Sequence, residues 1–444
     1  MRPPAVPALV LALVVALHGA AQAAPLKLTL DQVLAKAAAG PRARMAAGDT
    51  DAAAARIDEA DAARMPRGKA TLYGTVSPKI QCDDPQCLTT SPKNFALRFS
   101  GLYGSAQLDI TQPLYTFGKI AHARRAARAG LDAQRALADE AAGDLAVDAA
   151  RAYWGIKTAR ELGYMLDDGI EQLESAVKRL DERTGKDAIS IPDRQRVAVL
   201  LAEAKAQRAD AGAAERQALA GLRAITGIPD AEIDDAPLAA VEHAIPATAS
   251  AARRPQAIAA RQGARAADEL AAMTHGQYWP DLALVASALI AHAQGVDDPP
   301  STFANDPYNR SGAGVVLALQ WTIEPWSVGA RVGRARAEAR KAHAQRDLAE
   351  LGAQYDADTA LAEATGARDR LAASTDGDKA ARTWLAAVLQ ADAIGTSEPK
   401  DLADAYIAWF QMRARWAQAA YQWNVAVVRL GRAGGEFHAV PGRP

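Results

Sequence analysis

Apolar and polar residues alternate in four short segments, and this two-residue period is typical of β-strands with one face against an apolar medium. The segments are residues 70–80, 101–112, 281–291 and 312–324. In the last of them the apolar positions are Ala313, Val315, Leu317, Leu319 and Trp321. Each segment is about as long as a membrane-spanning strand, ~9–11 residues. We therefore predict two β-hairpins, over residues 70–112 and 281–324.

Much longer segments follow the 3.6-residue period of helices. Between Leu162 and Leu180 successive apolar residues are 4, 4, 3, 4 and 3 positions apart, close to the heptad of coiled coils. The pattern predicts two very long helices, at 114–183 and 326–393, each roughly 100 Å long at ~1.5 Å per residue. It predicts four helices of about half that length, at 30–65, 191–226, 247–279 and 400–431. Helices this long indicate an elongated protein and not a globular domain.

The chain divides into two similar halves. A helical stretch between Pro41 and Pro66 precedes the first hairpin, and one between Pro255 and Pro280 precedes the second. This period of about 212 residues is too long for a solenoid and indicates a duplication. We expect a first repeat at 24–227, a proline-containing equatorial linker at 228–246, a second repeat at 247–432 and a C-terminal tail at 433–444.

The step from strand to long helix has the same signals in both halves. In the first half the expected turn contains Pro113 and Gly118, and in the second it contains Pro325 and Gly329. Proline and glycine interrupt regular structure, so we predict that these four residues form the strand-to-helix turns.

Residues 1–23 have the features of a secretory signal peptide. Arg2 supplies a positive start, residues 6–17 form an apolar run, and Ala21-Gln22-Ala23 fits the cleavage pattern. The apolar run is shorter than the ~20 residues of a membrane-spanning helix. We therefore expect an exported protein.

Cys82 and Cys87 are the two cysteines of the chain. Because an exported protein meets oxidising conditions, we predict a disulfide between them. A metal site would need more ligands than this segment offers.

Composition and charge exclude several functions. The formal net charge is -1, which argues against the basic patch of a nucleic-acid-binding protein. The chain is 50% hydrophobic but only 5% aromatic, and its mean hydropathy is -0.14 because alanine, the best helix former, is abundant. No metalloprotease, nucleophile-elbow or P-loop motif occurs. We therefore expect neither an enzyme nor a cofactor or metal.

Four strands from one chain cannot close a barrel, and open strand edges are not tolerated in lipid. If the strands cross a membrane, several chains must share one barrel, and three chains would supply twelve strands. The alternative is a soluble four-stranded sheet lying on a helix, in a soluble periplasmic coiled-coil scaffold or adaptor protein.

The layout resembles the TolC-like outer membrane efflux family. The resemblance is carried by the duplicated half, by the turn Gln-Pro-Leu-Tyr-Thr-Phe-Gly at residues 112–118, and by residues 395–405, which fit the pattern G-x-x-x-x-x-D-x-x-D-A. It implies a homotrimer with a long coiled-coil-like α-helical barrel in the periplasm and a shared twelve-stranded β-barrel in the outer membrane of a Gram-negative bacterium.

The same resemblance implies an exit duct of a tripartite efflux or type I secretion system. Its partners are outer-membrane lipid, a periplasmic adaptor (membrane fusion) protein and an inner-membrane pump of the RND, ABC or MFS type. The resemblance does not identify the cargo. The hairpin tips, with Gly185 and Ser190 in the first half and Gly395 and Ser397 in the second, are the expected adaptor contacts, although a turn can require glycine for its own geometry.

Asp401 and Asp404 are three residues apart and share a helix face. The resemblance places them at the periplasmic entrance, where three copies would form a ring of six carboxylates that favours cations. The alternative is that acidic residues in a first helical turn stabilise the helix dipole.

Overall fold

The computed structural model of this chain describes residues 26–78, 99–182, 191–294, 296, 308–394, 396 and 398–436. The chain forms two compact units, each assembled from three stretches. The first unit comprises residues 1–41, 145–241 and 367–425. The second comprises residues 42–144, 242–366 and 426–444. The expected signal peptide and the expected pair Cys82 and Cys87 lie outside the described residues.

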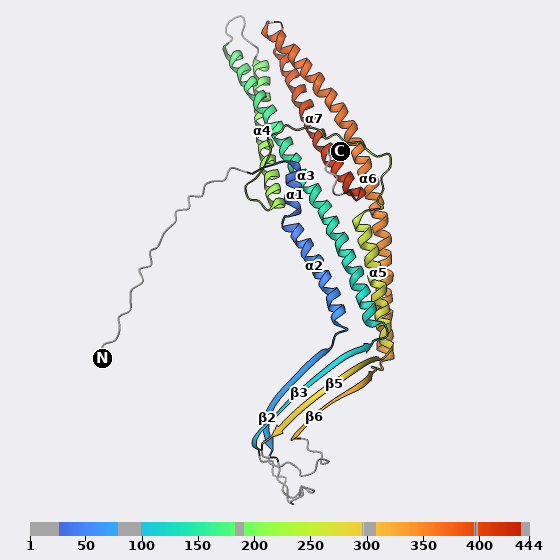
Figure 1. Cartoon of the computed structure of the whole chain (residues 1–444). Coiled ribbons are helices and arrows are strands. Elements are labelled where there is room, and N and C mark those ends of the chain that lie inside the picture. The colour runs from blue at the N-terminus through green and yellow to red at the C-terminus, as the bar shows by residue number, and fades with distance from the viewer. Residues whose placement is uncertain are drawn as a thin grey trace, which may run out of the picture. The chain divides into compact units, whose positions relative to one another are not determined.

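The second unit contains a four-stranded antiparallel sheet (Figure 1). Its strands are β2 (Arg67–Pro78), β3 (Phe99–Tyr115), β5 (Asp281–Ala293) and β6 (Arg310–Gln320). Their order is β2-β3-β5-β6, so the two hairpins of the sequence join along β3 and β5. Residues separated by more than 170 positions thus share one ladder, for example Ile110 and Ala286.

Several strand ends differ from the prediction by two to four residues, and the strand pairing explains the two differences at the ends of β3 and β6. β3 continues to Tyr115 and does not end at residue 112, because Pro113 and Tyr115 still face Ala283 and Leu282 across a bulge. β6 ends at Gln320 and not at residue 324, because Gln320 already faces Asp281, the first residue of β5. The preceding Pro280 has no N–H to extend the ladder.

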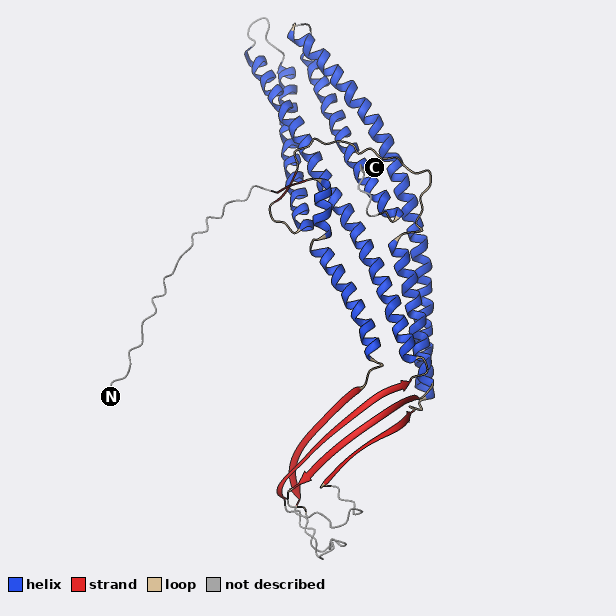
Figure 2. Ribbon diagram, in the orientation of Figure 1, coloured by secondary structure: helices blue, strands red, loops and turns tan. Residues whose placement is uncertain are grey.

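The helices of the second unit are α2 (Pro41–Ala62), α5 (Pro255–His275), the 3₁₀ helix η3 (Gly276–Tyr278), and parts of α3 (Lys119–Glu182), α6 (Pro325–Ala393) and α7 (Pro399–Gly434). The helix predicted from residue 247 begins only at Pro255. The residue before a proline avoids helical geometry, and Arg254 is extended, with φ -63° and ψ 121°. The strands form a layer that no helix of this unit overlies within the described part of the chain (Figure 2).

The single helix predicted at 30–65 is divided into α1 (Leu30–Ala38) and α2. At Gly40, between them, a Cβ atom would lie 2.5 Å from the carbonyl oxygen of Ile225, so only glycine fits this close approach. Pro41 then opens α2, as proline often does at a first helical position. The Gly40-Pro41 pair was therefore a visible signal for the break.

The first unit contains α1, α4 (Ile191–Thr226) and parts of α3, α6 and α7 (Pro399–Gly434). Its core comes from α3, α4, α6 and α7 and includes Leu166, Leu173, Leu200, Leu385, Tyr406 and Phe410. α3 and α7 approach closely at Gly169, where a Cβ atom would lie 2.2 Å from Cζ of Phe410. The apolar stripe of α7 is thus packing surface.

A small parallel sheet, which the sequence did not reveal, also belongs to the first unit. β1 (Leu26–Leu28) pairs with β4 (Ala231–Ile233), and Leu28 and Ile233 are buried. β4 lies in the segment predicted to be only a linker. Strands of three residues at this separation give no readable alternation.

Candidate functional site

The four-stranded sheet has one apolar face. Residues opposite one another in an antiparallel ladder point to the same side, so the register assigns each residue to a face. The apolar face, as we call it, carries Ala70, Leu72, Val76, Leu102, Ala106, Leu108, Ile110, Leu282, Leu284, Ala286, Ala288, Ile290, Ala313, Val315, Leu317 and Leu319. Its polar members Gln112, His292 and Ser311 lie near the strand ends.

The opposite face, which we call the polar face, has a different composition. On β2 and β3 it carries Lys69, Thr71, Tyr73, Thr75, Tyr103, Ser105, Gln107, Asp109 and Thr111. On β5 and β6 it carries mainly small residues, among them Ala283, Ser287, Gly312, Gly314 and Ala318. Such a division suits a sheet that separates an apolar medium from water.

The apolar face is exposed in a single copy of the chain. Leu72 is 76% exposed, Leu317 65% and Leu319 64%. Soluble monomers seldom expose a continuous apolar patch of this kind, and larger ones mark protein or membrane contacts. None of the described helices has the length and apolar content to cross a membrane.

Both outer strands are open. In the described residues β2 pairs only with β3, and β6 pairs only with β5. Each therefore presents a row of unpaired backbone N–H and C=O groups, which is a template for pairing with another chain.

The expected turn residues divide into two groups. Gly118 has φ +84° and follows Phe117 at φ +48°, so the first turn needs its glycine. Pro113 precedes this turn and lies within β3, at its bulge. Pro325 is the first residue of α6, whereas Gly329 lies inside that helix. The structure therefore does not place Gly329 in the second turn.

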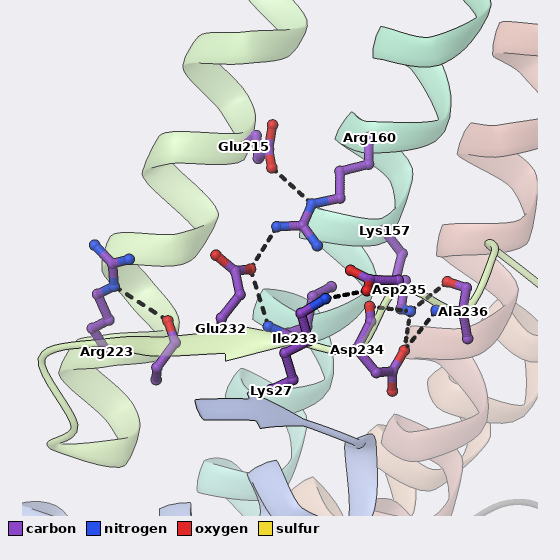
Figure 3. A network of polar contacts seen from close by, with 11 residues as sticks. Lys27, Lys157, Arg160, Glu215, Arg223, Glu232, Ile233, Asp234, Asp235 and Ala236 are labelled. Carbon is purple, nitrogen blue, oxygen red and sulfur yellow. Dashed lines mark hydrogen bonds and ion pairs between the residues drawn. The ribbon is translucent and has the colours of Figure 1, made fainter. Parts of the chain in front are cut away.

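In the first unit, a buried lysine fixes the segment after β4 (Figure 3). Lys157 of α3 is 3% exposed and contacts the carboxylate of Asp234 and the carbonyl oxygen of Ala236. Its Nζ also donates to the carbonyl oxygen of Asp234 at 2.8 Å, and the Tyr153 hydroxyl donates to Oδ2 of Asp234 at 2.9 Å. A charge this deeply buried is stable only with such partners.

A second cation extends the network. Arg160 of α3 donates from Nε to Glu215 of α4 at 2.7 Å and from Nη2 to Glu232 of β4 at 2.5 Å (Figure 3). α3, α4 and β4 are thus joined by charge-assisted hydrogen bonds, which are stronger than neutral ones. We call Lys157, Arg160 and their partners the linker clamp.

These contacts shift two pKa values. Partial burial works to raise the pKa of Asp234, but hydrogen bonds from Lys157 and Tyr153 outweigh it and hold the pKa below its usual range. Burial, followed by the hydrogen bond to Asp234, raises the pKa of Tyr153. Asp234 therefore stays ionised, and Tyr153 protonated, at neutral pH.

The linker segment is also attached to α7. Trp423 donates from Nε1 to the carbonyl oxygen of Val241 at 2.8 Å. The fully buried Asn424 accepts from the N–H of Val241 at 2.9 Å and donates to the carbonyl oxygen of Ala239 at 2.8 Å. The indole of Trp423 and the amide of Asn424 thus satisfy backbone groups of a segment that has no secondary structure of its own.

The second unit has a buried ion network of its own. Arg254 is fully buried and makes two parallel bonds to Glu140 of α3, at 3.0 and 2.9 Å. Arg432 of α7 bonds the same carboxylate at 2.6 Å and Asp144 at 2.6 Å. Sequence reasoning missed this network and the linker clamp, because their members are far apart in the chain and follow no spacing.

The expected gate residues lie at the start of α7. Asp401 is exposed in the first turn and Asp404 is half-buried one turn later. Neither carboxylate has a hydrogen-bond or ion-pair partner among the described residues. The expected tip residues Gly185, Ser190, Gly395 and Ser397 lie outside the described residues. No group of His, Cys, Asp and Glu in the described chain could hold a metal ion.

Comparison with known proteins identifies a family and several solved structures with this architecture. The chain matches the outer membrane efflux protein family over residues 37–228 and 248–436. It is similar to the Campylobacter jejuni CmeC outer membrane channel, with 16% identity, a TM-score of 0.76, and coverage of 92% of this chain and 86% of that chain. It is similar to the Vibrio cholerae outer membrane protein VceC, with 17% identity, a TM-score of 0.74, and coverage of 91% and 96%.

A third similar structure is the open state of the Neisseria gonorrhoeae MtrE outer membrane channel, with 18% identity, a TM-score of 0.73, and coverage of 91% of this chain and 88% of that chain. No sequence among the curated proteins matches the chain.

The chain belongs to the outer membrane efflux protein family. Family and fold are those of outer-membrane channels with a long periplasmic helical part. They support the exit-duct function expected from the sequence and do not favour a soluble scaffold or adaptor.

Asp234 and its neighbour Asp235 provide a matched test of the linker clamp. Asp234→Asn leaves Lys157 buried without a carboxylate, so we expect a loss of about 3 kcal/mol in stability at pH 7. Asp235→Asn removes only an exposed pair with Lys27, so the melting temperature should change little. Thermal unfolding of the purified protein measures both, and equal effects would contradict a clamp centred on Asp234.

The pH dependence of the same variants has a definite sign. Because the pKa of folded Asp234 is depressed, its stabilising effect is complete above the unfolded pKa of ~4. It is lost as the pH falls through the lower folded pKa. Asp234→Asn should therefore lose less stability than the wild type on acidification below pH ~4.

Leu317 and Val316 are adjacent, both are exposed, and they lie on opposite faces of β6. Leu317→Arg places a charge on the apolar face, and we expect a cost of about 2–4 kcal/mol in the membrane. Val316→Arg places the same charge on the polar face and should be tolerated. The amount of folded protein in the outer-membrane fraction measures the difference, and an equal loss from both variants would contradict the assignment of faces.

Proposed function

We propose that three copies of this chain form the exit duct of a tripartite efflux or type I secretion system. Each copy contributes its four strands to one twelve-stranded barrel in the outer membrane, and the helices form a conduit through the periplasm. The observation that carries this proposal is the sheet, which combines an exposed apolar face with two open edges.

Closure satisfies both features together. In hydrocarbon every backbone polar group needs an internal partner, so β6 of one copy must pair with β2 of the next. The apolar face then contacts lipid, and the polar face, with Lys69, Gln107 and Asp109, lines a water-filled lumen. Twelve strands lie within the range of known membrane barrels.

The periplasmic end is where we place the partners. The tips around Gly185 and Ser190 and around Gly395 and Ser397 would contact a periplasmic adaptor protein. The adaptor would connect the duct to an inner-membrane pump of the RND, ABC or MFS type. The duct itself performs no chemistry, so substrates diffuse through it and the pump supplies the free energy.

Asp401 and Asp404 are the proposed pore-lining gate. Two observations support this role: both residues lie in the first two turns of α7, and both lack a charged partner among the described residues. Three copies would place six carboxylates around the entrance. A ring of negative charge in a narrow pore attracts cations and repels anions.

Replacing both gate residues tests this role. In Asp401→Asn with Asp404→Asn, the side chains keep their size and their ability to cap a helix but lose their charge. We expect the cation-to-anion permeability ratio to fall about two-fold or more. The measurement is the reversal potential of single channels across a salt gradient.

The matched control is Asp401→Glu with Asp404→Glu, which keeps the charge and should keep the cation preference. Unchanged selectivity in the asparagine variant, with normal conductance, would remove the gate proposal and leave the exit duct intact.

A further inference from the structure

Three aromatic side chains form a row where the sheet meets the helices of the second unit. The bulge in β3 brings Tyr115 opposite Leu282, and therefore onto the apolar face. Phe117 meets Tyr115 edge-on at 4.7 Å and stacks on Trp279 at 5.9 Å. All three rings are exposed, Tyr115 at 57% and Trp279 at 51%. The row thus continues the apolar face beyond the last ladder pair.

The turn that presents this row is strained. Phe117 is the one residue other than glycine with positive φ among those that the structure describes, at +48°. A bulky residue seldom adopts this conformation, and such strain persists where the surroundings or a function require it. Next to this turn, Gly276 allows η3 to lie close to the start of α3, because a Cβ atom at Gly276 would lie 2.9 Å from Cγ of Lys119.

Beside the aromatic row lies an open hollow of about 380 Å³, a size within the ~300–1,000 Å³ range of ligand sites. The start of α3, the end of α5 with η3, and α6 line it. The lining residues are Phe117, His122, Ala271, Ala272, His275, Gly276, Trp279 and Arg336. Three of them are basic and none is acidic.

The carboxylate that contacts the lining residue His122 is already occupied by two cationic or N–H partners. Glu269 accepts from Nδ1 of His122 at 2.6 Å and from Nε of Arg125 at 2.9 Å. Arg336 is exposed and has no hydrogen-bond or ion-pair partner among the described residues, and His275 is exposed beside it in the lining. The hollow therefore has excess positive charge and N–H donors that nothing in the described chain satisfies.

We propose that this hollow binds the headgroup of an anionic phospholipid of the inner leaflet of the outer membrane. The proposal rests on the proposed function, which places the apolar face in lipid and the helices in the periplasm. Arg336 and His275 contact the phosphate, and Phe117 and Trp279 contact the glycerol backbone and the first methylene groups. A basic pocket flanked by half-exposed aromatic rings at the membrane boundary matches both parts of such a ligand.

The position of the hollow favours a lipid over a soluble anion. The aromatic wall of the hollow, formed by Phe117 and Trp279, is continuous with the apolar face through Tyr115. A lipid with its headgroup in the hollow would therefore have its acyl chains against that face. A free phosphate would use the basic residues but would leave the aromatic wall exposed to water. Each copy has one such hollow, so a trimer would hold three lipids.

The test is native mass spectrometry of the detergent-purified trimer titrated with phosphatidylglycerol. We expect up to three tightly bound molecules for each wild-type trimer. Arg336→Gln should weaken binding about five-fold, because each cation at a membrane surface contributes that much to the attraction of anionic lipid. Adding His275→Gln should weaken it further, and Arg336→Lys should restore most of it.

The matched control is Arg370→Gln, which removes the same charge from the same helix about 50 Å further along at ~1.5 Å per residue. It should leave lipid binding unchanged. Equal binding of phosphatidylcholine, displacement of the lipid by inorganic phosphate at similar concentration, or an Arg336→Gln variant that binds as the wild type does would each overturn the proposal.

Channel recordings on the same preparations separate this proposal from the exit-duct function. A wild-type protein that forms conducting trimers but retains no phosphatidylglycerol would overturn the lipid site alone. A protein that forms neither trimers nor channels would overturn the proposed function, and the lipid site with it.

Discussion

The open edges of the four-stranded sheet are the constraint on which the rest of the protein depends. An edge strand in contact with lipid cannot leave its N–H and C=O groups unpaired, and one chain supplies too few strands to close on itself. The exposed apolar face leads to the same conclusion, because exposure of side chains such as Leu317 and Leu72 to water is unfavourable. In the proposed trimer, folding of the membrane part is inseparable from assembly, and the unassembled chain would expose a surface prone to aggregation.

The helical part has a different problem, which is how to hold helices of 64 and 69 residues in register. Alanine allows close packing but buries little apolar area per residue, so polar networks fix specific points. The linker clamp around Lys157 does this in the first unit, and the Arg254–Glu140–Arg432 network does it in the second. Removing one partner of a buried ion pair leaves an uncompensated charge, so each network strongly disfavours any arrangement that separates its partners.

The fold class could be predicted from the sequence because it depends on periodicity. The alternation at residues 313–319 and the long proline-free helical patterns each identify their elements locally. The boundaries of elements were harder to predict where a tertiary contact determines them. β3 extends through Pro113 because a partner strand is present, and α5 begins only at Pro255. Lys157, Arg254 and the hollow at Arg336 could not be predicted, because their partners are brought together only by the fold. Asp401 and Asp404 were singled out by their spacing and by the family resemblance, and the gate role proposed for them would depend on other copies of the chain.

Cross-linking between copies tests the shared barrel most directly. In a chain with Cys82 and Cys87 replaced by serine, Thr71→Cys on β2 is combined in turn with cysteine at Gly312, Gly314, Val316 or Ala318, all on the polar face of β6. Closure predicts that at least one combination forms a reducible covalent trimer in the outer membrane, and that Leu72→Cys, on the opposite face, forms none with the same partners. Absence of any cross-link between copies across the whole series, from a protein that is folded and monomeric, would contradict the account.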